Sequence, residues 1–177
     1  VCEESLCDDG GGGGGPGECE EGEILDCFGN CGLESWLGDG SCDESMVDFN
    51  CLEFAYDNGD CQIDFEPHVM SIISSNCTGY CHTGNAIYQN GLNLESYEGL
   101  MNGGNSGPPV IAGYPEASLL IQKLNGTAPG EQMPDGQLPL ADNYIATISH
   151  WIAQGAIGPD DDGWEDGCVE DGLIEDC

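Results

Sequence analysis

Two thiols and an imidazole stand close together near the middle of the chain, between Cys77 and His82. Two cysteines followed directly by a histidine can bind a porphyrin through two thioether bonds and present the imidazole to its iron, and Cys-x-x-Cys-His is the motif of c-type haem attachment. Here three residues rather than two separate Cys77 from Cys81. The same side chains could instead close a small disulfide loop or form a zinc site with one further ligand. The motif alone leaves all three chemistries open.

A methionine beside a proline is the second candidate ligand. Met133 and Pro134 lie in a Gly-rich stretch, residues 130–136, between two predicted helices. A methionine in such a loop cannot pack as a helical core residue would. A thioether is a known partner of histidine on haem iron, where it raises the reduction potential. Met133 is therefore a candidate iron ligand, and His68 and His150 are the alternatives for that position.

The ligands must be positioned by the segment from 63 to 158, where apolar residues recur at helical spacing. The pattern predicts short helices at 66–73, 95–101 and 116–124, and Pro67 suits the first turn of the first helix. A fourth helix is predicted from the i, i+3/i+4, i+7 spacing of five residues, and Gly155 ends it. These five residues are Tyr144, Ile145, Ile148, Trp151 and Ile152.

Taken in order, these features make residues 65–158 resemble a class I cytochrome c, of the variant found in large secreted bacterial proteins. The stretch from Trp151 to Ala156 also matches that variant. The resemblance implies a mainly α, small cytochrome c helical fold around one haem c. It also implies thioether bonds at Cys77 and Cys81, and iron ligation by His82 and Met133. We expect the pocket to be lined by apolar and aromatic side chains: Tyr80, Tyr88, Leu92, Leu94, Val110, Leu120 and Trp151.

A second module precedes this region. Residues 19–62 hold six cysteines, with almost no helical or strand periodicity, and several Asp-rich turns with interleaved glycines. Small domains of this kind depend on disulfides and metal ions because their core is small. Four carboxylates brought together would repel one another unless a hard cation such as Ca²⁺ lay between them. The candidate ligands are Asp39, Asp43, Asp57 and Asp60. The alternative is that these acids are solvated turn residues.

Residues 27–61 of this module resemble a Notch-type repeat, because Asp57-x-Gly59-Asp60-Cys61 matches the closing motif of that family. The family is a small, disulfide-knotted, Ca²⁺-binding module. The resemblance implies calcium ligation by Asp57 and Asp60, with Asp39 and Asp43 as further ligands. The cysteine spacing upstream departs from the animal version of the repeat.

The overall charge limits the possible partners. The formal net charge is −33, with 34 acidic residues against a single basic one, Lys123. Nucleic acid is excluded as a partner because phosphate binding needs lysine and arginine, and anionic membrane surfaces are disfavoured for the same reason. A basic redox protein, or other copies of the chain in a homopolymer, is expected instead. No run of 18 apolar residues is present, so no membrane span is predicted.

Twelve cysteines in 177 residues point to an oxidising compartment. If two hold haem, ten remain, an even number compatible with five disulfides. Residues 1–18 form a Gly-rich segment with Cys2 and Cys7, and residues 159–177 form an acidic tail with Cys168 and Cys177. The start at Val1 is typical of a processed terminus. We therefore expect a secreted protein, with the periplasm or the cell surface as alternatives.

The expected function is electron transfer through a covalently bound haem, with no enzymatic activity, because a peroxidase would need the open iron position that Met133 fills. The alternative is a structural or adhesive filament subunit stabilised by disulfides and Ca²⁺, in which the haem is secondary.

Overall fold

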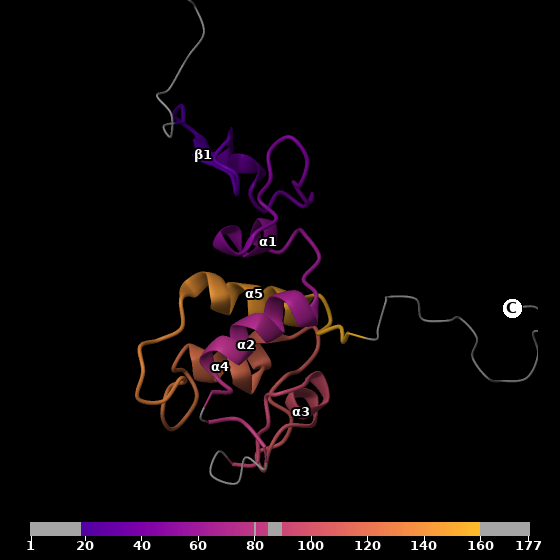
Figure 1. Cartoon of the computed structure of the whole chain (residues 1–177), viewed down its shortest axis with the longest axis vertical. Coiled ribbons are helices and arrows are strands. Elements are labelled where there is room, and N and C mark those ends of the chain that lie inside the picture. Colours follow the sequence, from indigo (N-terminus) through magenta and orange to yellow (C-terminus); the bar gives the residue numbers. More distant parts are fainter. Residues whose placement is uncertain (1–18, 80, 85–89, 160–177) are drawn as a thin grey trace, which may run out of the picture.

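A computed structural model of the chain describes residues 19–79, 81–84 and 90–159. The expectations for Tyr80, for Tyr88 and for the two terminal segments lie outside these residues. Figure 1 shows a small module at one end of the long axis and a helical domain at the other. Helix α5 (Asp142–Ala153) packs against the module on one side and against the other helices on the other side.

The module is held together by three disulfides, Cys19–Cys31, Cys27–Cys51 and Cys42–Cys61. It also contains an antiparallel pair of short strands, β1 (Glu23–Leu25) and β2 (Cys31–Leu33). The sequence, which has almost no strand periodicity in the module, predicted an irregular structure there and did not predict these two strands. Strands of three residues are too short to show an alternating pattern, so the sequence could not reveal them. Two turns of 3-10 helix complete the module, η1 (Glu34–Trp36) and η2 (Leu52–Phe54).

A left-handed turn, α1 (Ala55–Asn58), follows η2. All four of its residues have positive φ, between 50° and 57°. This conformation costs about 1–2 kcal/mol for each non-glycine residue, so the surroundings must hold it in place. The fully buried Asp57 carboxylate does so by accepting hydrogen bonds from the backbone N–H groups of Gly38 (3.1 Å) and Asp43 (2.7 Å).

The helical domain contains all four predicted helices. The turn of π-helix η3 (Phe65–Val69) leads directly into α2 (Met70–Asn76), which confirms the first. Helices α3 (Tyr97–Asn102) and α5 confirm the second and the fourth. The third is divided into the 3-10 turn η4 (Pro115–Ala117) and α4 (Leu119–Leu124).

The break between η4 and α4 lies at Ser118, which is buried and has an extended backbone. Its hydroxyl accepts a hydrogen bond from the backbone N–H of Ile111 (2.8 Å) and can donate to the carbonyl of Tyr114 (3.0 Å). Serine favours such local bonds over a helical interior, which is why the helix starts after it.

The core of the helical domain forms around Trp151, which is completely buried. Its ring lies 5.4 Å from that of Phe65 and 6.4 Å from that of Tyr97, measured between centroids. Its indole N–H donates to the carbonyl of Ile157 (3.0 Å). Helix α5 thus turns one apolar face to the other helices, as its spacing predicts.

The opposite side of α5 contacts the module through polar side chains. The Gln154 amide donates to the carbonyls of Gly59 and Cys61, each at 2.9 Å, and accepts from the N–H of Ile63, also at 2.9 Å. Asn143 donates to the carbonyl of Leu52 at 3.1 Å. The bonds to Gly59, Cys61 and Leu52 join the two parts of the molecule, and the bond from Ile63 lies within the helical domain.

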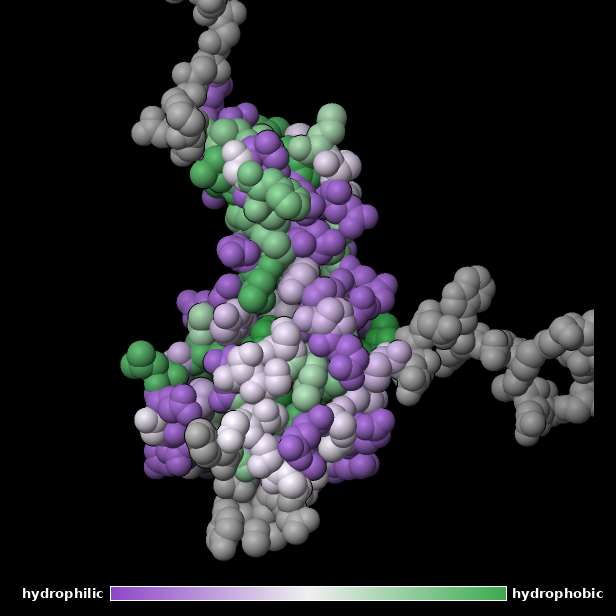
Figure 2. Space-filling view, in the orientation of Figure 1, coloured by the Kyte–Doolittle hydropathy of each residue, from purple (hydrophilic) through white to green (hydrophobic). Residues whose placement is uncertain are grey.

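The module leaves much apolar surface exposed. Figure 2 shows apolar side chains gathered over it, and Phe28 and Met46 are 78% and 89% exposed. Leu25, Leu33 and Trp36 are also exposed. Within the described residues, no helix combines the length and the apolar character needed to cross a bilayer.

Candidate functional site

A cavity of about 560 Å³ opens in the helical domain, bordered by the end of α2, the segment before α3, helix α4 and the loop that follows it. Four of the predicted ligands line it: Cys77, Cys81, His82 and Met133. The volume lies within the range of about 300–1,000 Å³ typical of cofactor and ligand sites. The fold therefore brings together two thiols, an imidazole and a thioether that the sequence places up to 56 positions apart.

The two thiols are free, whereas the six described cysteines of the module are in disulfides. Cys77 follows the C-terminus of α2, where its N–H donates to the carbonyl of Ile73 (2.7 Å). Burial raises the pKa of its thiol to about 11, with a smaller contribution from the neighbouring Cys81, which is exposed. The alternative of a Cys77–Cys81 disulfide loop is not what the structure shows.

The ring of His82 is fixed by its own hydrogen bond. Nδ1 lies 3.1 Å from the carbonyl oxygen of Leu92. Because a carbonyl can only accept, this contact requires the proton on Nδ1, which leaves the Nε2 lone pair free to bind a metal. The backbone around His82 is held as well, since its N–H donates to the carbonyl of Cys77 (3.2 Å) and its carbonyl accepts from Leu94 (2.9 Å). A histidine ligand is commonly oriented in this way.

Met133 lies half-buried on the loop after α4. Its backbone N–H donates to the carbonyl of Lys123 at 3.0 Å, which ties the loop to the last turn of the helix. Its side chain packs against the edge of the hydrophobic core. A thioether and an imidazole on the walls of one cavity are a suitable pair of axial ligands for haem iron.

The other predicted lining residues divide into two groups. Leu92, Leu94 and Leu120 line the cavity. Val110 and Trp151 are not among the described lining residues, because both are buried in the core behind it.

Sequence reasoning passed over several residues of the cavity wall. Lys123 is the most informative of them, and the sequence could have drawn attention to it because it is the single basic residue of the chain. Three further apolar residues, Leu119, Leu124 and Pro109, also line the cavity and carried no separate signal.

The two alternative histidines have other neighbours. Nδ1 of His68 accepts a hydrogen bond from the backbone N–H of Asp64 (2.9 Å), and its ring lies 4.2 Å from that of Tyr56. The His150 ring packs on Gly59 at the junction with the module, where a Cβ on Gly59 would come within 2.6 Å of it. Of the three histidines, His82 lines the cavity.

The four aspartates of the module influence one another without forming a close group. Burial raises the pKa of the Asp43 carboxyl above its usual range, and so do the charges of Asp57, Asp39 and Asp60. Two of these carboxylates accept backbone hydrogen bonds from a neighbouring loop: Asp57 from Gly38 and Asp43, and Asp60 from Gly40 (2.6 Å). One oxygen of Asp43 is buried and has no hydrogen-bond partner.

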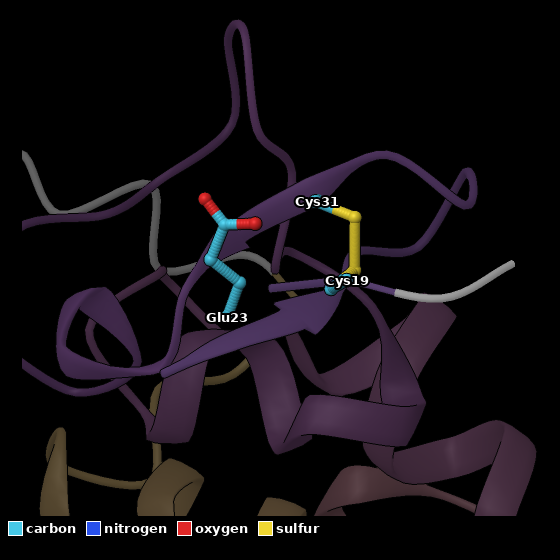
Figure 3. Close-up of side chains that lie close together, drawn as sticks. All are labelled: Cys19, Glu23 and Cys31. Atoms are coloured by element: carbon cyan, nitrogen blue, oxygen red, sulfur yellow. A yellow bond between two sulfur atoms is a disulfide. The ribbon is translucent and has the colours of Figure 1, made fainter. Parts of the chain in front are cut away.

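A different group in the module brings three ligand atoms within 4.8 Å of one another among the described residues: Cys19, Glu23 and Cys31. Figure 3 shows that the two sulfur atoms are joined in a disulfide, with the Glu23 carboxylate nearby. Sulfur in a disulfide is not a thiolate ligand, so this group cannot bind a metal in its oxidised form.

Comparison with known proteins adds an independent observation. A family model described as Planctomycete cytochrome C matches residues 77–136. The match begins at Cys77 and includes both His82 and Met133. The chain contains a cytochrome c-like domain. Comparisons with curated proteins and with solved structures found no match. The cytochrome c-like domain indicates haem binding and an electron-carrier role.

Proposed function

We propose that the chain transfers electrons through a single haem c bound to Cys77 and Cys81, with His82 and Met133 as axial ligands. The observation that carries the proposal is one cavity lined by two free thiols, an imidazole with its Nδ1 already bonded, and a thioether. Thiols that sit at a cavity wall outside any disulfide are unusual in a chain whose other described cysteines are paired.

Each residue has a separate part in this proposal. Cys77 and Cys81 would hold the macrocycle through thioether bonds. The Leu92 carbonyl would keep the His82 ring turned so that Nε2 faces the metal. When bound, the haem supplies the one-electron chemistry. The apolar walls formed by Leu92, Leu94 and Leu120 would keep water away and, together with the Met133 thioether, favour a raised reduction potential.

An electron carrier is favoured over an enzyme such as a peroxidase. Ligation from both His82 and Met133 would fill the axial positions, and a peroxidase needs one of them open. If Met133 did not ligate, the enzymatic alternative would gain support.

The proposed redox partner is a basic protein. A net charge of −33 gives a strongly negative surface potential, which steers cationic partners and falls off with salt. Electron transfer to a basic acceptor should therefore slow steeply as ionic strength rises.

The proposed location is outside the cell, with the periplasm and the cell surface as alternatives. Three disulfides within 43 residues are typical of an oxidising compartment.

The exposed apolar side chains of the module support a second candidate function, a filament subunit in which copies of the chain associate. Sedimentation at rising protein concentration distinguishes a filament subunit from a monomeric electron carrier, because a monomer at all concentrations would count against the filament.

We also propose that the module binds Ca²⁺ through Asp39, Asp43, Asp57 and Asp60. The buried, unpartnered oxygen of Asp43 supports this, since a buried carboxylate oxygen is costly unless a donor or cation meets it. A calcium ion that binds only the folded state would raise the melting temperature, and above the Kd this rise would grow with the logarithm of the Ca²⁺ concentration. No rise at millimolar Ca²⁺, with Mg²⁺ as the control, would exclude the site.

The haem proposal is tested on the purified protein by optical spectroscopy before and after extraction with acidified acetone. A covalent haem stays with the protein, and reversible reduction should be seen in a potentiometric titration. Colour that leaves with the solvent would contradict covalent attachment. A haem that stays but cannot be reduced reversibly would contradict the carrier function.

A further inference from the structure

The single basic residue of the chain lies at the candidate haem cavity. Lys123 is half-buried in the last turn of α4 and lines the cavity wall. Its ammonium group donates to the backbone carbonyls of Pro129 (2.6 Å) and Glu131 (3.2 Å). With 34 acidic residues in the chain, the one cation is thus engaged with the main chain of a loop rather than spread over the surface.

The loop that Lys123 holds is the one that carries Met133. The backbone N–H of Met133 donates to the carbonyl of Lys123 itself (3.0 Å), so Lys123 holds the loop with both its side chain and its main chain. Gln132 adds a neutral bond to the carbonyl of Leu124 (2.7 Å). Gly130 has φ +85°, and a Cβ there would lie 3.2 Å from the Lys123 ammonium, so glycine allows the close approach.

We propose that Lys123 is a positioning residue for Met133, holding the loop so that the thioether stays on the cavity wall. This inference rests on the proposed function, in which Met133 ligates the iron. Hydrogen bonds from an ammonium group are stronger than neutral ones. The loop also carries the acidic Glu131 and Asp135, and Lys123 supplies the one positive side chain that can offset their repulsion from the rest of the molecule.

The decisive variant is Lys123→Met, which keeps a long apolar stem but loses both donors and the charge. Losing the bonds to Pro129 and Glu131 should shift the equilibrium between a docked and a detached loop by about tenfold. Lys123→Arg keeps the charge and the donors and should restore most of the docking. Lys123→Gln, which brings no second thioether to the cavity wall, is measured beside it, and the sulfur band must behave alike in both; Lys123→Gln also serves alone should Lys123→Met fail to fold. A charge control is Ser45→Glu, which adds a negative charge at an exposed position on the module.

Two readouts are taken on the haem-loaded protein. The first is the charge-transfer absorption band that marks sulfur ligation of ferric haem, which should weaken in Lys123→Met, persist in Lys123→Arg and be unchanged in Ser45→Glu. The second is hydrogen exchange at the Met133 amide, which should speed up by about tenfold in Lys123→Met alone, because its bond to the Lys123 carbonyl opens with the loop.

The outcomes separate this inference from the proposed function. A wild-type protein without the sulfur band would remove Met133 as a ligand and overturn both. A wild-type band that persists in Lys123→Met, with unchanged exchange at Met133, would overturn the positioning role alone. A lower reduction potential with the band and the exchange unchanged would also overturn it, because Lys123 would then act only through its charge.

Discussion

Removing the side chain of Gln154 should uncouple the module from the helical domain. This amide is half-buried directly after the C-terminus of α5 and makes three hydrogen bonds, all at 2.9 Å, with main-chain groups of Gly59, Cys61 and Ile63. These groups lie where the module ends and the helical domain begins. Gln154→Ala deletes all three bonds while leaving the apolar face of α5, including Trp151, in place.

The cost can be worked out from the bonds. A hydrogen bond between neutral groups contributes about 1 kcal/mol to the free energy of unfolding, so three are worth about 3 kcal/mol. Because Gln154 is half-buried, water can form some of the lost hydrogen bonds in the variant, which reduces the loss of stability to about 2 kcal/mol. With a urea dependence of about 2 kcal/mol/M, the midpoint of unfolding should fall by about 1 M.

The assay is urea unfolding of the oxidised protein, followed by far-UV circular dichroism and by tryptophan fluorescence. Gln122→Ala is the matched control, because it removes one exposed bond to the carbonyl of Glu116 within the helical domain and should change stability by less than about 0.5 kcal/mol. Asn143→Ala, which removes the other bond across the junction, should give an intermediate loss. If Gln154→Ala and Gln122→Ala unfold at the same urea concentration, these contacts do not join the two parts.

Three further predictions concern single groups. In protein produced without haem, iodoacetamide at pH 8 should modify Cys81 well before Cys77. The pKa of the Cys77 thiol is about 11 instead of the ordinary 9.0, which lowers its thiolate fraction by about a hundredfold. Equal rates of modification, measured by mass spectrometry, would contradict the buried position of Cys77. Burial disfavours ionisation of Asp26, but hydrogen bonds from Asn30, and from the main chain of neighbouring residues, outweigh it and lower its pKa from 3.8 to about 2. The ionised Asp26 therefore contributes about 2 kcal/mol to the free energy of unfolding above pH 4, and this contribution is lost as the pH falls from about 4 to 2. In Asp26→Asn, the free energy of unfolding should change less over this pH range. Replacing both Cys27 and Cys51 by Ala opens a loop with a sequence separation of 24 and should cost about 3.5 kcal/mol, seen as a lower melting temperature.

The four candidate ligands that line the cavity could be predicted because each of them has a local signal. Cys77, Cys81 and His82 lie within six consecutive residues, and Met133 stands out as a methionine beside a proline in a loop. The helices around them follow from apolar spacing, most clearly in α5. A short motif and a 3.6-residue period can both be recognised in a sequence without knowledge of the tertiary fold.

Other parts of the site depend on tertiary contacts that no local pattern encodes. Trp151 and Val110 were expected on the pocket wall but lie in the core, since hydrophobicity alone does not say which apolar residue faces a cavity. The bond from the His82 ring goes to a main-chain carbonyl, which every residue has. The role of Lys123 depends on a loop that returns to the end of its own helix.

The module was the least predictable part. Disulfide pairing is a choice among fifteen connectivities for six cysteines, and sequence cannot make that choice. The left-handed turn at Ala55–Asn58 contains no glycine, so the sequence held no signal for its positive φ values. Whether the aspartates around it bind Ca²⁺ stays a prediction.

The most direct test of the central claim is the mass of a tryptic fragment. Trypsin can cut these 177 residues only after Lys123, so the fragment 1–123 contains both candidate attachment cysteines. After reduction and alkylation, we predict that this fragment is heavier by one haem and that Cys77 and Cys81 are not alkylated. A fragment without haem, in which both cysteines are alkylated, would contradict covalent attachment at this site.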